Sequence, residues 1–252
     1  MASTESLPQP SDPTASDHVS AVAPWWHTVL LLVIVLGVGV LQGLTGVSRR
    51  ATHLPSRMSL YVGTLCYEYF LLGLVWLGLL LRRTKLRDLI GGRWARWKDF
   101  WTDVGVAFVF WLAVLVVVGG LSWALHFNGN EAAAFLLPQT VPEMIFWVVL
   151  AVSAGFCEEL VFRGYIQRQC LALSQNVAAA VILQGVIFGA AHAYQGHKAI
   201  LVISAYGMLF GTLAAMRKSL RPGMLQHATQ DSVSGIASHF LTKLRHIPLI
   251  RF

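Results

Sequence analysis

The chain has 252 residues, of which 56% are hydrophobic and only 12% are charged, and its mean hydropathy is +0.60. Soluble domains carry about 25% charged residues, so this balance excludes an ordinary globular protein and predicts a membrane protein. The net charge of +7 is then expected in basic loops beside a lipid bilayer, because the sequence contains no nucleic-acid-binding pattern.

The first 23 residues are predicted to form a disordered tail. They are rich in Ser, Pro, Thr and Asp, and residues 1–20 contain no Lys or Arg. This composition buries too little apolar surface to fold, and it lacks the basic region with which a signal peptide begins. Residues 24–252 are predicted to form a single transmembrane domain, which begins at Trp25 and Trp26 because Trp favours the membrane interface.

Seven apolar stretches separated by short polar loops are predicted to be transmembrane helices, since about 20 apolar residues are needed to cross a bilayer. The predicted spans are 28–47, 59–81, 104–125, 140–173, 177–193, 199–216 and 222–241. The fifth span is expected to end part-way across the membrane, at residues 194–197. The predicted fold class is therefore all-α, a polytopic bundle of about seven transmembrane helices.

Lys and Arg are distributed unequally between the two sides of this bundle. The loops on the N-terminal side contain twelve of them, seven within residues 82–98, whereas the other side contains seven. Because short cytoplasmic loops carry the excess of positive charge, the N-terminus is predicted to be cytoplasmic. The loop 82–99 also contains Trp94 and Trp97, with Trp101 close behind, which indicates a segment that lies on anionic lipid.

Two adjacent carboxylates and an arginine interrupt the fourth span, at Glu158, Glu159 and Arg163. A charge near the bilayer centre costs at least ~2.5–3.5 kcal/mol, so such residues are either functional or paired with one another. Glu159 and Arg163 lie four residues apart and share a helix face, which predicts an ion pair. Glu158 points about 100° away and is expected to find partners on other helices. The alternative is a buried ion network that only holds the helices together.

Two later helices each place a His in the membrane. Phe188 precedes His192 by four residues, so its ring is expected behind the imidazole, and His227 precedes Asp231 by the same spacing. Polar groups in lipid face the interior of a bundle and find one another there. The sequence therefore predicts an intramembrane active-site cavity on which Glu158, His192 and His227 converge, close to the N-terminal face of the membrane.

A weaker outlier is Glu68, which lies between Tyr67 and Tyr69 in the second span. A carboxyl group in an apolar helix needs a hydrogen-bond partner or access to a polar cavity. The sequence leaves open whether Glu68 has a structural role or lines the same cavity.

In this order, the motifs Glu-Glu-x-x-x-Arg, Phe-x-x-x-His and His-x-x-x-Asp resemble those of the CAAX protease and bacteriocin-processing family, also called the CPBP or Abi family. The resemblance covers residues 140–241, the predicted catalytic core. It implies an intramembrane endopeptidase related to the type II CAAX prenyl endopeptidases, located in a bacterial inner (plasma) membrane. Its substrate is expected to be a membrane-associated protein or peptide, and the need for a prenyl group is left open.

Peptide hydrolysis requires a base that activates water and donors that bind the developing oxyanion. A carboxylate and an imidazole that face one water meet the first need, so Glu158 and His192 are expected to activate it. His227 is then expected to bind the oxyanion. The resemblance implies that Asp231 assists His227, although relatives more commonly carry Asn there. The expected supporting residues are Glu159, Arg163 and Phe188.

Two alternatives accompany this hypothesis. Glu158, His192 and His227 are suitable zinc ligands, but the sequence contains no His-Glu-x-x-His motif, so catalysis without a metal or other cofactor is favoured by the resemblance to glutamate proteases. The second alternative is a non-catalytic protein on the same fold, which acts in membrane interaction or bacteriocin self-immunity.

Overall fold

The computed structural model describes residues 18–45, 56–127 and 131–245, and in these ranges it contains helices and no strands. In chain order, the helices are α1 (Trp25–Thr45), α2 (Arg57–Leu81), α3 (Leu86–Ile90), α4 (Trp97–Ala124), α5 (Glu131–Leu136), α6 (Val141–Glu158), the π-helical segment η1 (Glu159–Ile166), α7 (Gln167–Ser174), α8 (Val177–Ala191), the 3-10 turn η2 (Ala193–Gln195), α9 (His197–Arg217) and α10 (Arg221–Arg245). The predicted all-α class is thus confirmed.

Within the described residues, five helical stretches are long and apolar enough to cross a membrane. They are α1, α2, α4, α9 and the continuous helix from α6 through η1 to α7. The other two predicted spans also form helices, but α8 has only 15 residues and α10 carries more polar side chains. The chain is therefore an integral membrane protein with five candidate spans, and the count of seven stays a prediction.

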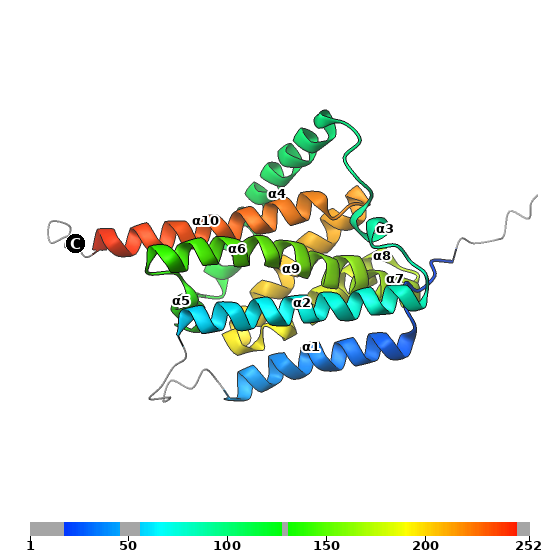
Figure 1. The fold of residues 1–252 in the computed structure, drawn as a ribbon, viewed down its shortest axis with the longest axis horizontal. Coiled ribbons are helices and arrows are strands. Elements are labelled where there is room, and N and C mark those ends of the chain that lie inside the picture. Colours follow the sequence, from blue (N-terminus) through cyan, green and yellow to red (C-terminus); the bar gives the residue numbers. More distant parts are fainter. Residues whose placement is uncertain (1–17, 46–55, 128–130, 246–252) are drawn as a thin grey trace, which may run out of the picture.

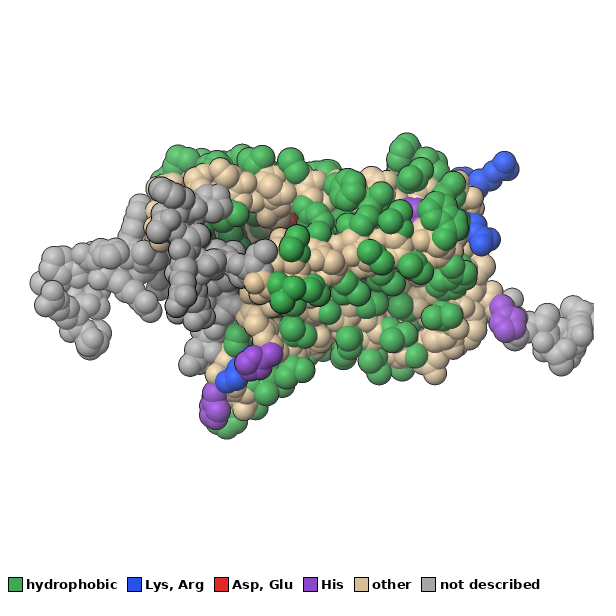
Figure 2. All heavy atoms as spheres, turned by 90° about the horizontal axis from the view of Figure 1, so that it is seen from below, with side chains coloured by type: hydrophobic (Ala, Val, Ile, Leu, Met, Phe, Trp, Pro, Cys, Tyr) green, Lys and Arg blue, Asp and Glu red, His purple; other side chains and the backbone are tan. Residues whose placement is uncertain are grey.

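The long helices pack against one another in one bundle. Helix α6 packs against α2 and α10, α8 packs against α9, and α4 contacts both α9 and α10 (Figure 1). The face seen in Figure 2 is covered mainly by hydrophobic side chains, and the Lys and Arg side chains visible there lie toward its ends. This distribution fits a bundle whose middle is surrounded by lipid.

Helix α6 begins where its sequence signature predicts. The N–H of Glu143 donates to Thr140 Oγ1 at 3.4 Å, and the N–H of Thr140 donates to Glu143 Oε2 at 3.1 Å. Each side chain thus satisfies a backbone group that has no partner within the helix, while Pro142 occupies the first turn, where its missing N–H costs nothing. This capping box fixes the start of the helix that carries the paired carboxylates.

The segment before α1 corrects the predicted length of the N-terminal tail. Residues 1–17 lie outside the described ranges, but residues 18–23, which the prediction also placed in the tail, pack against α7. Gln169 Oε1 accepts from the N–H of Val22 at 2.9 Å, and Gln169 Nε2 donates to the carbonyl of Ala23 at 3.0 Å. Composition alone missed this because the order comes from a buried side-chain amide 147 residues away.

The helix predicted at 140–173 is not α-helical throughout. Between Glu159 and Ile166 it widens into the π-helical segment η1, all eight residues of which are buried. A π-helical turn contains an extra residue and shifts the side chains that follow it, and such turns often occur at functional sites. The segment begins directly after Glu158, so the two adjacent carboxylates lie at the junction of α6 and η1.

Candidate active site

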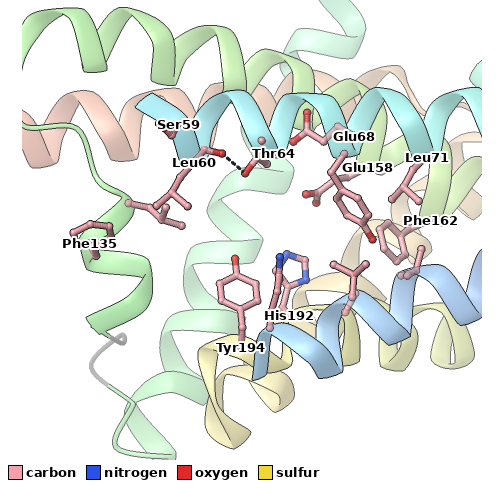
Figure 3. A pocket seen from close by; sticks show the side chains of 17 residues that line it. Ser59, Leu60, Thr64, Glu68, Leu71, Phe135, Glu158, Phe162, His192 and Tyr194 are labelled. Carbon is pink, nitrogen blue, oxygen red and sulfur yellow. Dashed lines mark hydrogen bonds between the residues drawn. The ribbon is translucent and has the colours of Figure 1, made fainter. Parts of the chain in front are cut away.

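A cavity of about 460 Å³ opens beside this junction. Glu68, Glu158 and His192 supply its polar side, and Figure 3 shows these side chains directed into one space. The described residues that line it are Val35, Val38, Gln42, Ser59, Leu60, Gly63, Thr64, Tyr67, Glu68, Leu71, Phe135, Leu136, Glu158, Phe162, Ala191, His192 and Tyr194.

The direction of this cavity differs from the expectation. It extends toward the C-terminal half of α1, the first turn of α2 and the end of α5, where Gln42, Ser59 and Leu136 line it. These elements lie at the end of the bundle opposite the start of α1 (Figure 1). The sequence predicted a site near the N-terminal face because Glu158 lies only a few residues before Arg163, which was expected to leave the membrane. In the structure Arg163 and the rest of η1 are buried in the bundle, so Glu158 lies further from that face.

His227 brings α10 to the same carboxylate. Its Nε2 atom lies 3.8 Å from Glu158 Oε2 and 3.6 Å from Asp231 Oδ2. The side chains of Glu158 and Asp231 are 24% and 35% exposed, whereas that of His227 is 5% exposed. His227 and Asp231 are not among the cavity-lining residues, so they reach Glu158 from α10 while His192 shares the cavity with it.

Glu159 contacts His227 on the opposite side of the ring. Its Oε1 atom lies 3.2 Å from His227 Nδ1, and both side chains are buried. Because an ionised carboxylate only accepts hydrogen bonds, Nδ1 carries the hydrogen, and Nε2 is directed toward Glu158 and Asp231. Glu159 thus binds one nitrogen of the imidazole while Glu158 lies 3.8 Å from the other, an arrangement that the sequence did not predict.

Arg163 completes this buried network. Its Nη1 atom lies 3.0 Å from Glu159 Oε1, and both side chains are at most 1% exposed, so the predicted ion pair is confirmed. The guanidinium also lies over the rings of Phe188 and Phe210, at 4.4 and 5.1 Å from the ring centroids. The faces of these rings carry partial negative charge, which stabilises the buried guanidinium of Arg163.

His192 is oriented by the end of its own helix. Helix α8 ends at Ala191, near the predicted interruption, and His192 Nδ1 lies 2.9 Å from the carbonyl oxygen of Phe188. A carbonyl only accepts, so Nδ1–H donates and Nε2 is left as an acceptor. The ring of Phe188 packs 4.8 Å from the imidazole, as the spacing predicted. Of the two candidate catalytic histidines, His192 is thus the one that presents a free ring nitrogen to the cavity.

A close approach of two helices brings these groups together. A Cβ atom on Gly155 would lie 2.7 Å from the backbone nitrogen of Ala228, so only glycine allows α6 to lie this close to α10. Gly155 precedes Glu158 by three residues, and Ala228 follows His227. Small residues at helix contacts in membranes serve this purpose, and here the contact sets the distance between the glutamates and His227.

These residues fall within a recognisable domain. Residues 138–233 match the family model described as Rce1-like, type II CAAX prenyl endopeptidase. This segment is an Rce1-like CAAX protease domain of the CPBP family. Membership implies a CAAX-type intramembrane protease. No curated protein and no solved structure matches the chain.

The Rce1-like domain does not contribute every group at the cavity. Glu68 and Tyr67 come from α2, which precedes the matched residues, and Ser153 Oγ donates to Glu68 Oε2 at 2.7 Å. Sequence reasoning noticed Glu68 as an outlier, but nothing in the sequence connected it to Ser153. It also missed Trp147, whose indole N–H donates to the backbone carbonyl of Asp231 at 2.7 Å.

The donor atoms of the Rce1-like site were also compared with the needs of a metal ion. Among the described residues, no group of three or more His, Cys, Asp or Glu side chains has an arrangement that could hold one. Two of the imidazole nitrogens are already engaged, His227 Nδ1 by Glu159 and His192 Nδ1 by the carbonyl of Phe188. Metal-binding His residues commonly make such bonds with the ring nitrogen that does not bind the ion, and Nε2 of each ring is not used in these two bonds, so catalysis without a metal stays a prediction.

Replacing Arg163 should destabilise the Rce1-like domain more than any other single loss of charge in it. In Arg163→Met, the buried carboxylate of Glu159 loses its ion pair with the guanidinium and keeps only His227 as a partner, which we expect to cost about 3–5 kcal/mol. The yield of monodisperse protein in detergent and its thermal unfolding temperature should both fall. Arg96→Met is the matched control, because Arg96 pairs with Asp99 at the surface and its side chain is 77% exposed. Equal stability of the two variants would contradict the structural role of Arg163.

Proposed function

We propose that the chain is an intramembrane endopeptidase that hydrolyses a peptide bond of a membrane-associated protein or peptide, with water activated by Glu158 and His192. The observation that carries this proposal is that Glu158 and His192, both within the segment that matches the CAAX protease model, line one cavity. Glu158 supplies a base, and the free Nε2 atom of His192 accepts a hydrogen bond from the same water, which fixes the direction of its attack. Neither role requires a metal.

In this proposal His227 binds the oxyanion. A neutral imidazole that donates from Nδ1 to Glu159 has no hydrogen on Nε2, so it can donate to an oxyanion only as imidazolium. Glu158, Glu159 and Asp231 surround the ring within 3.8 Å and stabilise that form. Asp231 then acts by stabilising the charged ring of His227. It does not need to donate a hydrogen bond to the oxyanion, which an ionised aspartate cannot do and which the Asn side chain of relatives can.

The lining of the cavity supports an apolar substrate segment. Apart from the polar groups near Glu158, its walls are formed largely by aliphatic and aromatic side chains such as Val35, Leu71 and Phe162. A prenyl chain or a hydrophobic peptide segment fits such walls, because binding removes apolar surface from water. We therefore place prenylated peptides first among the substrates to be tested.

We also propose that the bundle crosses the membrane seven times, with α8 and α10 as the two additional spans, in a bacterial inner (plasma) membrane. The basic loop between α2 and α4 lies at the same end as the start of α1, where Thr84 donates to the carbonyl of Val22 at 3.3 Å. The excess of Lys and Arg at this end supports a cytoplasmic N-terminus.

A defined peptide tests the proposed activity. Purified protein in lipid nanodiscs should cleave a farnesylated CAAX peptide and release its last three residues, which mass spectrometry detects. The same peptide without the farnesyl group measures how far the apolar walls depend on a prenyl chain. If neither peptide is cleaved, membranes that contain wild type or Glu158→Ala should be compared by proteomics for an accumulated precursor. The absence of both cleavage and any precursor would contradict proteolysis.

A further inference from the structure

A carboxyl group outside the matched domain shares the cavity with Glu158. Glu68 lies on α2, seventy residues before the start of the matched segment at residue 138, and its side chain lines the cavity although the residue is only 5% exposed. Figure 3 shows Glu68 and Glu158 directed into the same space from neighbouring helices. A peptide bond held between these two helices presents different atoms to each carboxyl group.

The surroundings of the two carboxyl groups differ. Glu158 is 24% exposed and lies 3.8 Å from Nε2 of His227. Glu68 is buried, and no Lys or Arg among the described residues forms an ion pair with it; its one hydrogen-bond partner in those residues is the hydroxyl of Ser153. Two carboxyl groups in different surroundings are a common basis for separate acid and base roles in hydrolysis.

The hydrogen bond from Ser153 also determines which oxygen of Glu68 is available. Ser153 Oγ donates to Oε2 at 2.7 Å, and Ser153 lies on α6 one turn before Cys157, whose sulfur is 3.9 Å from the same hydroxyl. With Oε2 occupied as an acceptor, a proton on the carboxyl group resides on Oε1. The hydrogen bond from Ser153 thus fixes the orientation of the Glu68 carboxyl group. A general acid needs such a fixed orientation to give its proton to one atom.

We propose that Glu68 is the general acid of the proposed hydrolysis and protonates the leaving amine. Water attacks the scissile carbonyl carbon, a C–O bond forms, and the water proton passes to Glu158. The C–N bond then breaks with its electron pair on nitrogen, and nitrogen takes the proton of Glu68. A water in the cavity returns the proton from Glu158 to Glu68, so one water is consumed and both carboxyl groups recover their starting states.

This inference rests on the proposed function, and leaving-group chemistry tests it separately. An amide nitrogen must be protonated to leave, whereas an alkoxide depends far less on an acid. The probes are the farnesylated CAAX peptide and its analogue with an ester in place of the scissile amide. In Glu68→Gln, kcat for the amide should fall by at least about 100-fold, whereas kcat for the ester should change little. Glu158→Gln should lose both activities, because both need the activated water.

Ser153→Ala is the control for a merely structural role of Glu68. It removes the hydrogen bond that positions Glu68 but keeps the acid, so it should lower cleavage of the amide less than Glu68→Gln does, whereas Glu68→Gln keeps an acceptor for Ser153 and removes the proton. Equal cleavage of the amide by Glu68→Gln and wild type, equal loss of amide and ester in Glu68→Gln, or a larger loss of amide cleavage in Ser153→Ala than in Glu68→Gln would each overturn the proposal. Inactivity of wild type on both probes would instead contradict the proteolysis on which it rests.

Discussion

Glu158→Gln is expected to abolish proteolysis and leave the protein folded. The amide has nearly the same volume as the carboxyl group but cannot take a proton from water, and general-base catalysis contributes about 10²–10⁴-fold to rate. Glu158 is partly exposed at the cavity and is not the partner of Arg163, so its charge is not needed to compensate a buried cation. Initial rates on the farnesylated peptide, with size-exclusion profiles of both proteins, provide the measurement.

Glu143→Gln is the matched control for this prediction. It makes the same change on the same helix, but Glu143 caps the first turn, outside the cavity. We expect its activity to match that of wild type. If Glu158→Gln retains the rate of wild type, Glu158 is not the base. A different result would favour a binding protein on a protease fold. In that case neither wild type nor Glu158→Gln would cleave the peptide, and Glu158→Gln would keep a biological effect such as immunity.

The long apolar helices were predictable because hydrophobic length and capping are local properties. The second and sixth predicted spans end at or within one residue of α2 and α9, and the capping box placed the start of α6. The π-helical segment η1 was not predictable, since no residue between 159 and 166 has a known preference for π geometry. The order of residues 18–23 was missed because Gln169, not their own composition, holds them.

At the site, too, contacts between residues close in the sequence were predictable, and contacts between residues far apart were not. The pairs Glu159–Arg163 and Phe188–His192 follow from a spacing of four residues, and the structure confirms both. The bond between Glu159 and His227 joins residues 68 apart, and its geometry depends on the close contact at Gly155. The sequence could show that three helices carry ionisable groups. It could not show which nitrogen of which imidazole each carboxylate would meet.

We further expect catalysis to survive removal of metal ions. If Glu158 and His192 activate water directly, purified protein should cleave the farnesylated peptide at an unchanged rate in excess EDTA or 1,10-phenanthroline. Elemental analysis should detect no stoichiometric zinc. The expectation rests on the geometry of the donors, because no group of three His, Cys, Asp or Glu side chains among the described residues is arranged to hold an ion.

Zinc catalysis makes the opposite prediction at each step. A catalytic zinc has three protein ligands and one open position, so a chelator should silence the enzyme, and added zinc should restore it. The variant His192→Asn provides the control, since losing one ligand should lower the zinc content of the protein, whereas a metal-free enzyme should lose only activity. Restoration by zinc after complete inactivation would overturn the metal-free mechanism, and Glu158, His192 and His227 would then act on the same water as ligands of the ion.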